Sequence, residues 1–270
     1  MPLATIHFDW PYFLQRLFHP DPVFWGALAT TVCVAVVAQL FGVVLGLFSA
    51  LAGLSRIRPL NLLSYVYVLA FRGTPLVVQI FFVYYSVNLF LGFDLFPRTL
   101  NLYAFAVSGA VLAGITALSF NEGAYMSEIF RAAINAIDPG QMEAAKSVGM
   151  TRALAMRRII LPQAARIVVP PLGNEFNGML KNTSLVAFIG VYEMFQDAEV
   201  TYSNTFKPTE VFLAVACWYL LLTIIWSAIQ ARIERKLGAS EREEREGWLT
   251  RLVGVRPRWE GRVPGRPGAR

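Results

Sequence analysis

The residues of this sequence that could carry chemistry are polar side chains isolated within long apolar stretches. Arg72 is the one charged residue between positions 59 and 91, and Thr74 follows it closely. A charge in so apolar a stretch is costly to bury and marks a candidate functional site. The planar guanidinium can bind a carboxylate through two parallel N–H donors. The structural alternative is an ion pair between Arg72 and an acid such as Glu122.

Acidic and aromatic residues further along could hold a positively charged group. Glu122 and Tyr125 lie three positions apart, so a helix would place them on one face, where Glu122 could bind an ammonium group. The alternative for Glu122 is a residue at the membrane boundary. Glu128 and Arg131 have the same spacing and are expected to pair with each other.

A polar cluster interrupts a later apolar stretch. Its members are Lys181, Asn182, Thr183 and Ser184. Such a cluster suits a hydrated pathway for a solute. The alternative is hydrogen bonding between neighbouring helices within a membrane.

Patterns that support covalent chemistry are missing from the sequence. Gly173 and Gly178 have the spacing of a phosphate-binding loop, but Met and Leu follow where Lys and Ser or Thr are required. The two histidines, His7 and His19, lie in the N-terminal segment, and the two cysteines lie singly within apolar stretches. We therefore expect a chain that catalyses no reaction by itself and binds no metal.

The composition indicates a membrane protein with an all-α fold. Apolar residue types make up 56% of the 270 residues and charged types 16%, whereas a soluble domain carries about 25% charged residues. A disordered chain would be far less apolar. Long apolar stretches predict five membrane-spanning helices, at 22–55, 59–91, 99–121, 167–191 and 211–231. Pro170, Pro171 and Gly173 are expected to break or kink the fourth.

The distribution of basic residues predicts how the chain is oriented. The net charge of +6 is concentrated after the first, third and fifth spans, which does not indicate a nucleic-acid-binding surface. Lys and Arg gather on the cytoplasmic side of membranes. We therefore expect an external N-terminus, a cytoplasmic C-terminus and a cytoplasmic loop at about 122–166. The segment 191–210 would then be external, with the acids Glu193, Asp197, Glu199 and Glu210.

The long cytoplasmic loop carries helix signals of its own. Asp138 followed by Pro139 is typical of a helix start, and Gly149 is typical of a helix end. Thr151 can cap a second helix, which is expected to end at about Leu161, before Pro162. Two short helices joined by a glycine turn would offer a surface to a soluble partner.

Spaced residues in this loop and in the spans resemble a known family. Glu143-Ala144-Ala145, Gly149 and Leu161-Pro162 resemble the EAA signature of the transmembrane subunits of ABC importers that use a binding protein. Residues 71–75 with Gln79, residues 124–129 and residues 180–185 resemble the polar-amino-acid permeases within that family. The resemblance covers about residues 22–237 and implies the five-span fold of type I importers.

The resemblance also implies partners and a mechanism. Residues of about 131–165 would dock on a separate ATPase subunit, which binds ATP and Mg, so no cofactor is expected in this chain. The coupling contacts would be Glu143, Ala144, Ala145, Gly149, Leu161 and Pro162. An external solute-binding protein would deliver a polar amino acid to a pathway between this chain and a second permease, identical or homologous. Candidate substrate contacts are Arg72, Thr74, Glu122, Tyr125, Lys181, Asn182, Thr183 and Ser184.

We expect three regions: an external segment at 1–22, a transmembrane domain at 23–237, and a charged, disordered tail at 238–270 that could lie on membrane lipid. The main alternative function is a self-sufficient secondary transporter or channel. That class needs inverted repeats or a coupling-ion site, and five spans do not divide into two equal halves. The external acidic segment is expected to contact the binding protein.

Overall fold

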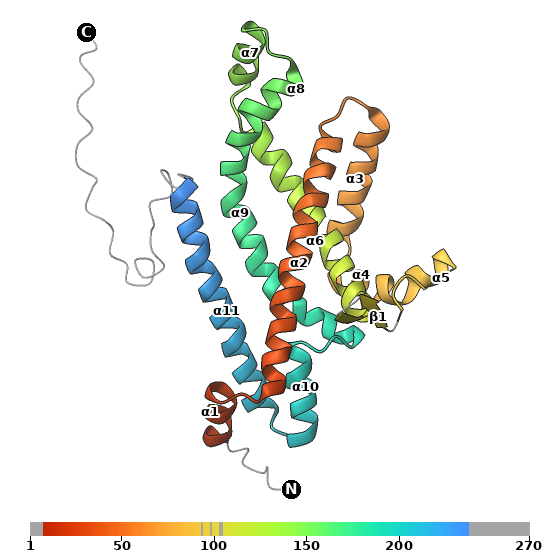
Figure 1. The fold of residues 1–270 in the computed structure, drawn as a ribbon, viewed down its shortest axis with the longest axis vertical. Coiled ribbons are helices and arrows are strands. Elements are labelled where there is room, and N and C mark those ends of the chain that lie inside the picture. The colour runs from red at the N-terminus through yellow and green to blue at the C-terminus, as the bar shows by residue number, and fades with distance from the viewer. Residues whose placement is uncertain (1–7, 93, 98, 103–104, 238–270) are drawn as a thin grey trace, which may run out of the picture.

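The computed structural model is an elongated bundle of helices and describes residues 8–92, 94–97, 99–102 and 105–237 (Figure 1). The predicted tail at 238–270 lies outside these residues. In chain order the elements are α1 (Trp10–Phe18), α2 (Pro22–Gly53), α3 (Arg58–Gly73), α4 (Leu76–Phe81), η1 (Phe82–Ser86), α5 (Val87–Leu91), β1 (Thr99–Leu102), β2 (Phe105–Ser108), α6 (Gly109–Asn135), α7 (Pro139–Ser147), α8 (Arg152–Ala155), η2 (Met156–Ile160), α9 (Leu161–Asn182), η3 (Thr183–Ile189), α10 (Met194–Thr205) and α11 (Pro208–Leu237). The predicted helical fold class is confirmed.

The long helices α2 and α6 pack together at the centre of the bundle because glycines let their backbones come close (Figure 1). A Cβ atom added at Gly42 would lie 2.5 Å from the Cγ of Glu122, and one at Gly46 would lie 2.5 Å from the Cβ of Met126. Neither position has room for a side chain. These glycines therefore fix the contact between the first and third predicted spans.

Two helices are long and apolar enough to cross a bilayer by themselves, among the residues that the structure describes. They are Pro22–Gly53, with 32 residues, and Pro208–Arg235, with 28 residues. Arg58–Gly73 and Leu76–Ser86 meet the same criteria only when taken together, and they are bent by 109° at the break between them. The count of five spans stays a prediction.

The second predicted span is therefore not one straight helix. Thr74 has an extended backbone, with φ −120° and ψ 147°, and separates α3 from α4. Pro75 explains this conformation, because a proline disfavours helical geometry in the residue before it. The polar residues around this bend belong to the candidate site described below.

A two-stranded antiparallel hairpin precedes α6. β1 pairs with β2 in a register that places Thr99 opposite Ser108. The sequence predicted a helix from residue 99, whereas α6 begins at Gly109. An apolar stretch by itself does not distinguish a strand from the start of a helix, which is why this boundary was wrong.

The prolines of the fourth predicted span do not break it. α9 continues through Pro170 and Pro171. Two side chains of α11 hold this stretch: Trp226 Nε1 donates to the carbonyl of Gly173 at 2.8 Å, and Gln230 Nε2 donates to that of Pro170 at 3.2 Å. These hydrogen bonds attach α9 to α11 along the stretch that contains the prolines, although neither binds a carbonyl that Pro170 or Pro171 leaves without an N–H partner.

The second helix of the cytoplasmic loop does not end at Leu161. α8 continues through η2, a π-helical turn, directly into α9, and Pro162 lies in the first turn of α9. Pro162 follows directly after the π-helical turn, where the regular i to i−4 hydrogen-bond pattern of the helix is interrupted. The loop and the fourth predicted span are therefore connected by one continuous helical path (Figure 1).

Candidate functional site

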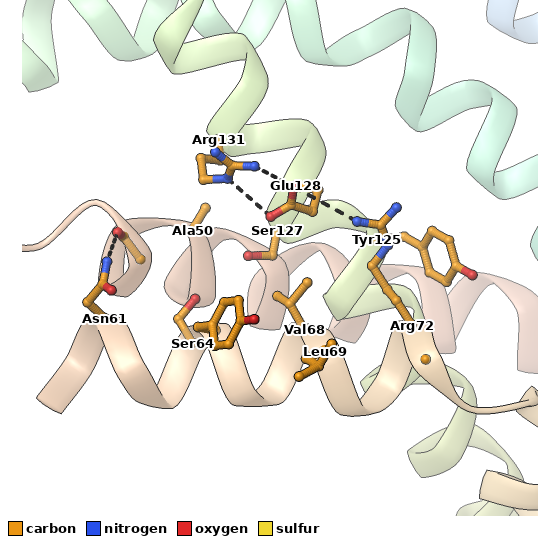
Figure 2. A pocket seen from close by; sticks show the side chains of 13 residues that line it. Ala50, Asn61, Ser64, Val68, Leu69, Arg72, Tyr125, Ser127, Glu128 and Arg131 are labelled. Atoms are coloured by element: carbon orange, nitrogen blue, oxygen red, sulfur yellow. Dashed lines mark hydrogen bonds and ion pairs between the residues drawn. The ribbon is translucent and has the colours of Figure 1, made fainter.

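A pocket of 690 Å³ lies between α2, α3 and α6 (Figure 2). It follows α3 from Asn61 to the bend at Gly73, on the side that faces α6. Its polar lining consists of Asn61, Ser64, Tyr65, Arg72, Tyr125, Ser127, Glu128 and Arg131. The pocket is large enough for a small polar solute and presents both signs of charge.

Arg72 extends from the last turn of α3 into this pocket (Figure 2). Its guanidinium lies 5.1 Å from the centre of the Tyr125 ring, and its Nη1 lies 3.9 Å from the Oε2 of Glu128. The guanidinium makes no hydrogen bond within the described part of the chain. Arg72 does form the ion pair with an acid that the structural alternative suggested, but its partner is Glu128 and not Glu122. Arg72 keeps its N–H donors available to a ligand.

Glu128 is held in place by its own helix. Arg131 donates from Nε to Glu128 Oε1 at 3.1 Å, and its Nη2 lies 2.5 Å from Oε2. This confirms the predicted pair. The carboxylate therefore stands between two guanidinium groups, one on α6 and one on α3, at the wall of the pocket.

Glu122 does not belong to the pocket. Its side chain is buried between α6 and α2, where Gln39 Nε2 donates to its Oε1 at 2.7 Å. Tyr125 faces Arg72 instead, so Glu122 and Tyr125, although three residues apart on α6, do not line one site. The close approach of α2 at Gly42 encloses Glu122 between the two helices.

An amide pair, missed by the site prediction, locks the bend between α3 and α4. Gln79 Nε2 donates to the carbonyl of Phe71 at 2.8 Å and to the hydroxyl of Thr74 at 2.8 Å. Gln79 Oε1 accepts from Asn121 Nδ2 at 2.9 Å, and Asn121 also donates to Phe71. Thr74 thus has a structural role here. The spacing from residue 71 to Gln79 was the available sequence signal.

Replacing Gln79 with leucine should loosen this bend. The substitution leaves the Phe71 carbonyl and the Asn121 amide with fewer partners, and each buried polar group left unsatisfied costs about 1–3 kcal/mol. We expect a lower thermal unfolding midpoint of the purified chain in detergent. Gln163→Leu is the matched control, because Gln163 makes one long hydrogen bond, 3.5 Å to Gln141. Equal midpoints for the two variants would contradict the role of Gln79.

A second pocket of 690 Å³ lies between α9, α10 and α11. Lys181 and Ser184 line it together with Asn177, Tyr219 and Ser227. The Oδ1 atom of Asn177 is buried and has no hydrogen-bond partner within the described residues.

The predicted polar cluster is therefore divided. Asn182 is exposed but does not line the second pocket, and Thr183 is fully buried, with its hydroxyl donating to the carbonyl of Leu180 at 2.8 Å. Lys181 and Ser184 are three residues apart and share a helical face, whereas Asn182 and Thr183 fall on other faces.

The coupling region forms the end of the bundle opposite α1 and α10 (Figure 1). Asp138 caps α7 by accepting from the N–H of Gly140 at 2.8 Å, and Thr151 caps α8 by accepting from Leu154 at 3.3 Å. Gly149 has φ +82° and reverses the chain between these helices. These predicted caps and the glycine turn are confirmed.

The face that this region offers to a partner differs in part from the expectation. Glu143 and Ala144 are exposed, but Ala145 is 3% exposed and packs inward. Val148 is 78% exposed beside Gly149. Sequence reasoning missed Val148, although an apolar residue at the end of a short polar helix was a usable signal. Leu161 and Pro162 begin α9, directly after the π-helical turn η2 that contacts α7.

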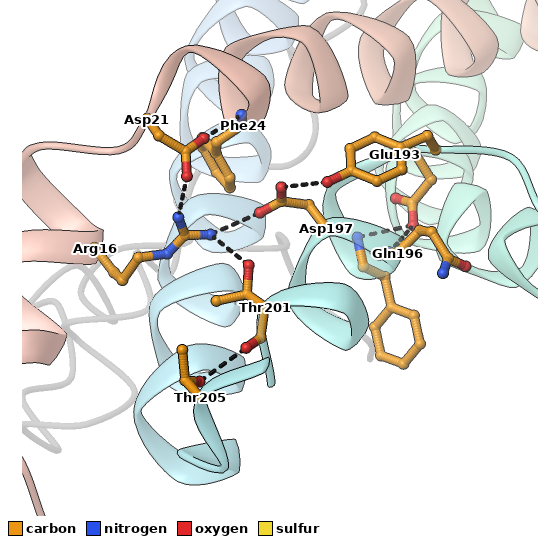
Figure 3. Close-up of polar contacts among 10 residues, drawn as sticks. Arg16, Asp21, Phe24, Glu193, Gln196, Asp197, Thr201 and Thr205 are labelled. Atoms are coloured by element: carbon orange, nitrogen blue, oxygen red, sulfur yellow. Dashed lines mark hydrogen bonds and ion pairs between the residues drawn. The ribbon is translucent and has the colours of Figure 1, made fainter. Parts of the chain in front are cut away.

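The acids of the segment 191–210 mostly face inward. Glu193 is fully buried and accepts from the N–H groups of Phe195 and Gln196, while the Tyr219 hydroxyl donates to it at 2.6 Å. Asp197 is 2% exposed and binds Arg16 (Figure 3). Glu210 is also buried. These three acids do not form the surface expected to contact a binding protein, because they satisfy donors within the chain.

Comparison with a family model and with curated proteins gives consistent matches. The model described as "Binding-protein-dependent transport system inner membrane component" matches residues 42–239. The "Probable amino-acid permease protein YxeN" of Bacillus subtilis (strain 168) is 42% identical over 229 residues, covering 85% of this chain and 96% of that protein. The "L-cystine transport system permease protein TcyB" of the same organism is 39% identical, covering 80% of this chain and 87% of that protein.

Solved structures share the fold. One chain, from "Crystal structure of an amino acid ABC transporter with histidines", is 36% identical, with a TM-score of 0.72 over 86% of this chain and 100% of that chain. A chain of the MetNI methionine ABC transporter is 17% identical, with a TM-score of 0.65 over 80% of this chain and 96% of that chain, which supports the fold alone.

Proposed function

The chain belongs to the family of binding-protein-dependent transport system inner membrane components, and from this premise we propose which of its residues meet the substrate and which meet the ATPase. It is a transmembrane subunit of an ABC importer for amino acids, a multi-pass protein of the inner membrane. The ATPase of such an importer is a separate chain, so this subunit is not an enzyme by itself. A self-sufficient transporter is not favoured.

The pocket between α3 and α6 is the proposed binding site for the amino acid. The observation that supports it is the Arg72 guanidinium, which lines the pocket with no hydrogen bond inside the described chain, 3.9 Å from the Glu128 carboxylate. An α-carboxylate can bind the guanidinium through two N–H donors. The α-ammonium can approach Glu128 and the face of Tyr125, which attracts cations.

The coupling contact with the ATPase is proposed at the tip of α7. Glu143, Ala144, Val148 and Gly149 are the exposed residues that would enter a groove of the ATPase. α8, η2 and α9 would carry motion of this tip towards the second pocket, because they form one helical path. Glu128 and Arg131 lie on α6 close before α7, so motion of the tip also reaches the Arg72 pocket.

The arrangement in the membrane and the partners complete the proposal. The N-terminus is external and the C-terminus cytoplasmic, since the coupling region, which is rich in basic residues, must meet a cytoplasmic ATPase that binds ATP and Mg. An external solute-binding protein delivers the amino acid. A second permease, identical or homologous, completes the pathway with this chain. The transmembrane domain extends over about residues 23–237.

Uptake of the amino acid should require ATP, and an uptake assay should identify the substrate. The assay uses vesicles whose membrane contains this chain and its cognate ATPase. ATP is enclosed inside the vesicles, and the binding protein is added outside. We expect uptake of one or a few radiolabelled polar amino acids from a panel, and none without ATP. Because the permease has no ATPase activity of its own, vesicles with the permease alone should take up no amino acid.

The other outcomes separate the parts of the proposal. Uptake that proceeds without ATP would indicate a secondary transporter. An assembled complex that hydrolyses ATP but takes up no amino acid of the panel would contradict the substrate class while leaving the importer architecture intact.

A further inference from the structure

The N-terminal helix α1 exposes a purely apolar stripe. Trp10, Leu14 and Phe18 are 61%, 44% and 67% exposed. They are spaced four residues apart, so they follow one side of the helix. Among these three side chains the indole N–H of Trp10 is the one hydrogen-bonding group. Such a stripe is costly to leave in water.

The opposite side of α1 is fastened to the ends of α10 and α11. Arg16 donates to Asp197 and to Asp21, each at 2.7 Å, and to the hydroxyl of Thr201 at 3.2 Å (Figure 3). Asp197 is 2% exposed, so this contact lies inside the protein. Phe13, on the same side as Arg16, is 7% exposed. The orientation of α1 about its own axis is therefore fixed.

A second contact fastens the start of α1. Asp9 caps the helix by accepting from the N–H of Tyr12 at 3.0 Å, while Lys207 donates to its other oxygen at 2.6 Å. The Asp9 N–H donates to Glu210 at 2.8 Å. The hydrogen bond from the Lys207 ammonium lowers the pKa of the Asp9 carboxyl, so the cap stays ionised at neutral pH.

The position of α1 identifies what covers the stripe. Three residues, 19–21, separate α1 from α2, a helix that is long and apolar enough to cross the bilayer. α1 therefore lies at the level where α2 enters the membrane. Trp25, in the first turn of α2, is 50% exposed and packs against Trp218 of α11 at a ring distance of 5.3 Å. Exposed tryptophans at the end of a span are typical of the boundary between lipid and water.

We propose that α1 is an interfacial helix whose Trp10, Leu14 and Phe18 side chains are inserted among the lipids at the membrane surface from which α2 begins. The polar contacts of Arg16 and Asp9 hold it against α10 and α11. An apolar stripe continuous with the lipid-facing surface of a span suits lipid, since a docking surface for a soluble protein is richer in hydrogen-bonding groups. The proposal depends on α2 being a span and is independent of the substrate site.

The proposal is tested by measuring how deeply spin labels on α1 lie in the membrane of the assembled importer. Cys33→Ala and Cys217→Ala give a background free of cysteine, and a single cysteine is then introduced at Leu14, Phe18 or Gln15 and labelled with a nitroxide. Gln15 is the matched control, an exposed polar neighbour of the stripe. In nanodiscs of phosphatidylcholine and phosphatidylglycerol, labels at 14 and 18 should be accessible to oxygen and protected from a nickel chelate. The label at 15 should be several-fold more accessible to the chelate.

Assembly with the ATPase confirms that each labelled chain is folded. If the labels at 14 and 18 are as accessible to the chelate as the label at 15, the stripe faces water and the proposal is overturned. If they become protected only when the binding protein is added, the stripe is a protein contact, which also overturns it.

Discussion

Gly149→Asp should abolish ATP-driven uptake while leaving the protein in the membrane. Gly149 turns the chain after α7 with φ +82°, and among the described residues no atom beyond its two chain neighbours lies within 4 Å of the place where a Cβ would be. A side chain there meets nothing inside the subunit and projects toward the proposed ATPase groove. The cost to folding is limited to the positive φ, about 1–2 kcal/mol and less for Asp than for most residues.

The loss of uptake should result from weaker association between this chain and the ATPase. A weakening of the docking free energy by 1.4 kcal/mol reduces association about tenfold, and a buried, unpaired carboxylate costs more than that. The measurement compares uptake into vesicles with the amount of chain in the membrane and the amount of ATPase that copurifies with it.

Gly149→Ala is the matched control for this variant. It imposes the same positive φ without a charge and with the smallest possible side chain, so it should keep most of the transport. Normal transport by Gly149→Asp would contradict the coupling assignment. Equal losses for Ala and Asp would indicate that the shape of the turn, and not the docking surface, is responsible.

Arg72→Ala should weaken binding of the amino acid by about 10-fold to 100-fold, since a hydrogen bond to a charged group contributes about 1.5–3 kcal/mol. The fold should survive, because the guanidinium makes only loose contacts, 3.9 Å to Glu128 and 5.1 Å to the centre of the Tyr125 ring, and the side chain is 43% exposed. The measurement is the concentration of substrate-loaded binding protein at half-maximal uptake, together with the yield of assembled complex. Arg72→Lys should restore part of the affinity, since an ammonium lacks the fork of donors.

Lys181→Ala is the matched comparison in the second pocket. Lys181 lines that pocket and makes no ion pair within the described part of the chain. We expect the larger loss of affinity with Arg72→Ala. A loss confined to Lys181→Ala would move the site to the pocket between α9 and α11. An unchanged affinity and yield in Arg72→Ala would show that Arg72 has no important role in transport.

Local features of the site were predictable from the sequence, because their partners lie within a few residues. Asp138 and Thr151 cap helices whose N–H groups lie two or three positions away. Glu128 and Arg131 meet across one helical turn. Gly149 has the positive φ that its place after α7 indicated.

Contacts between distant segments were not predictable in this way. Arg72 faces Glu128 and Tyr125, and Glu122 is buried against Gln39, although the sequence suggested Glu122 as an example of an acid that could pair with Arg72. Which side of α6 faces α3 depends on the close packing at Gly42 and Gly46. α2 is apolar on all sides, so its periodicity indicates no preferred face.

The sequence by itself determined the membrane class, the helical fold and the cap-and-turn chemistry of the coupling tip, since these depend on composition and on hydrogen bonds between near neighbours. The tertiary structure decided the bend of 109° after α3, the continuity of α9 through its prolines and the burial of the acids near α10. The physical reason is that these features involve donors from other elements, which local sequence does not place: Asn121 binds Gln79 at the bend that Pro75 begins, Trp226 binds Gly173 of α9, and Arg16 binds Asp197.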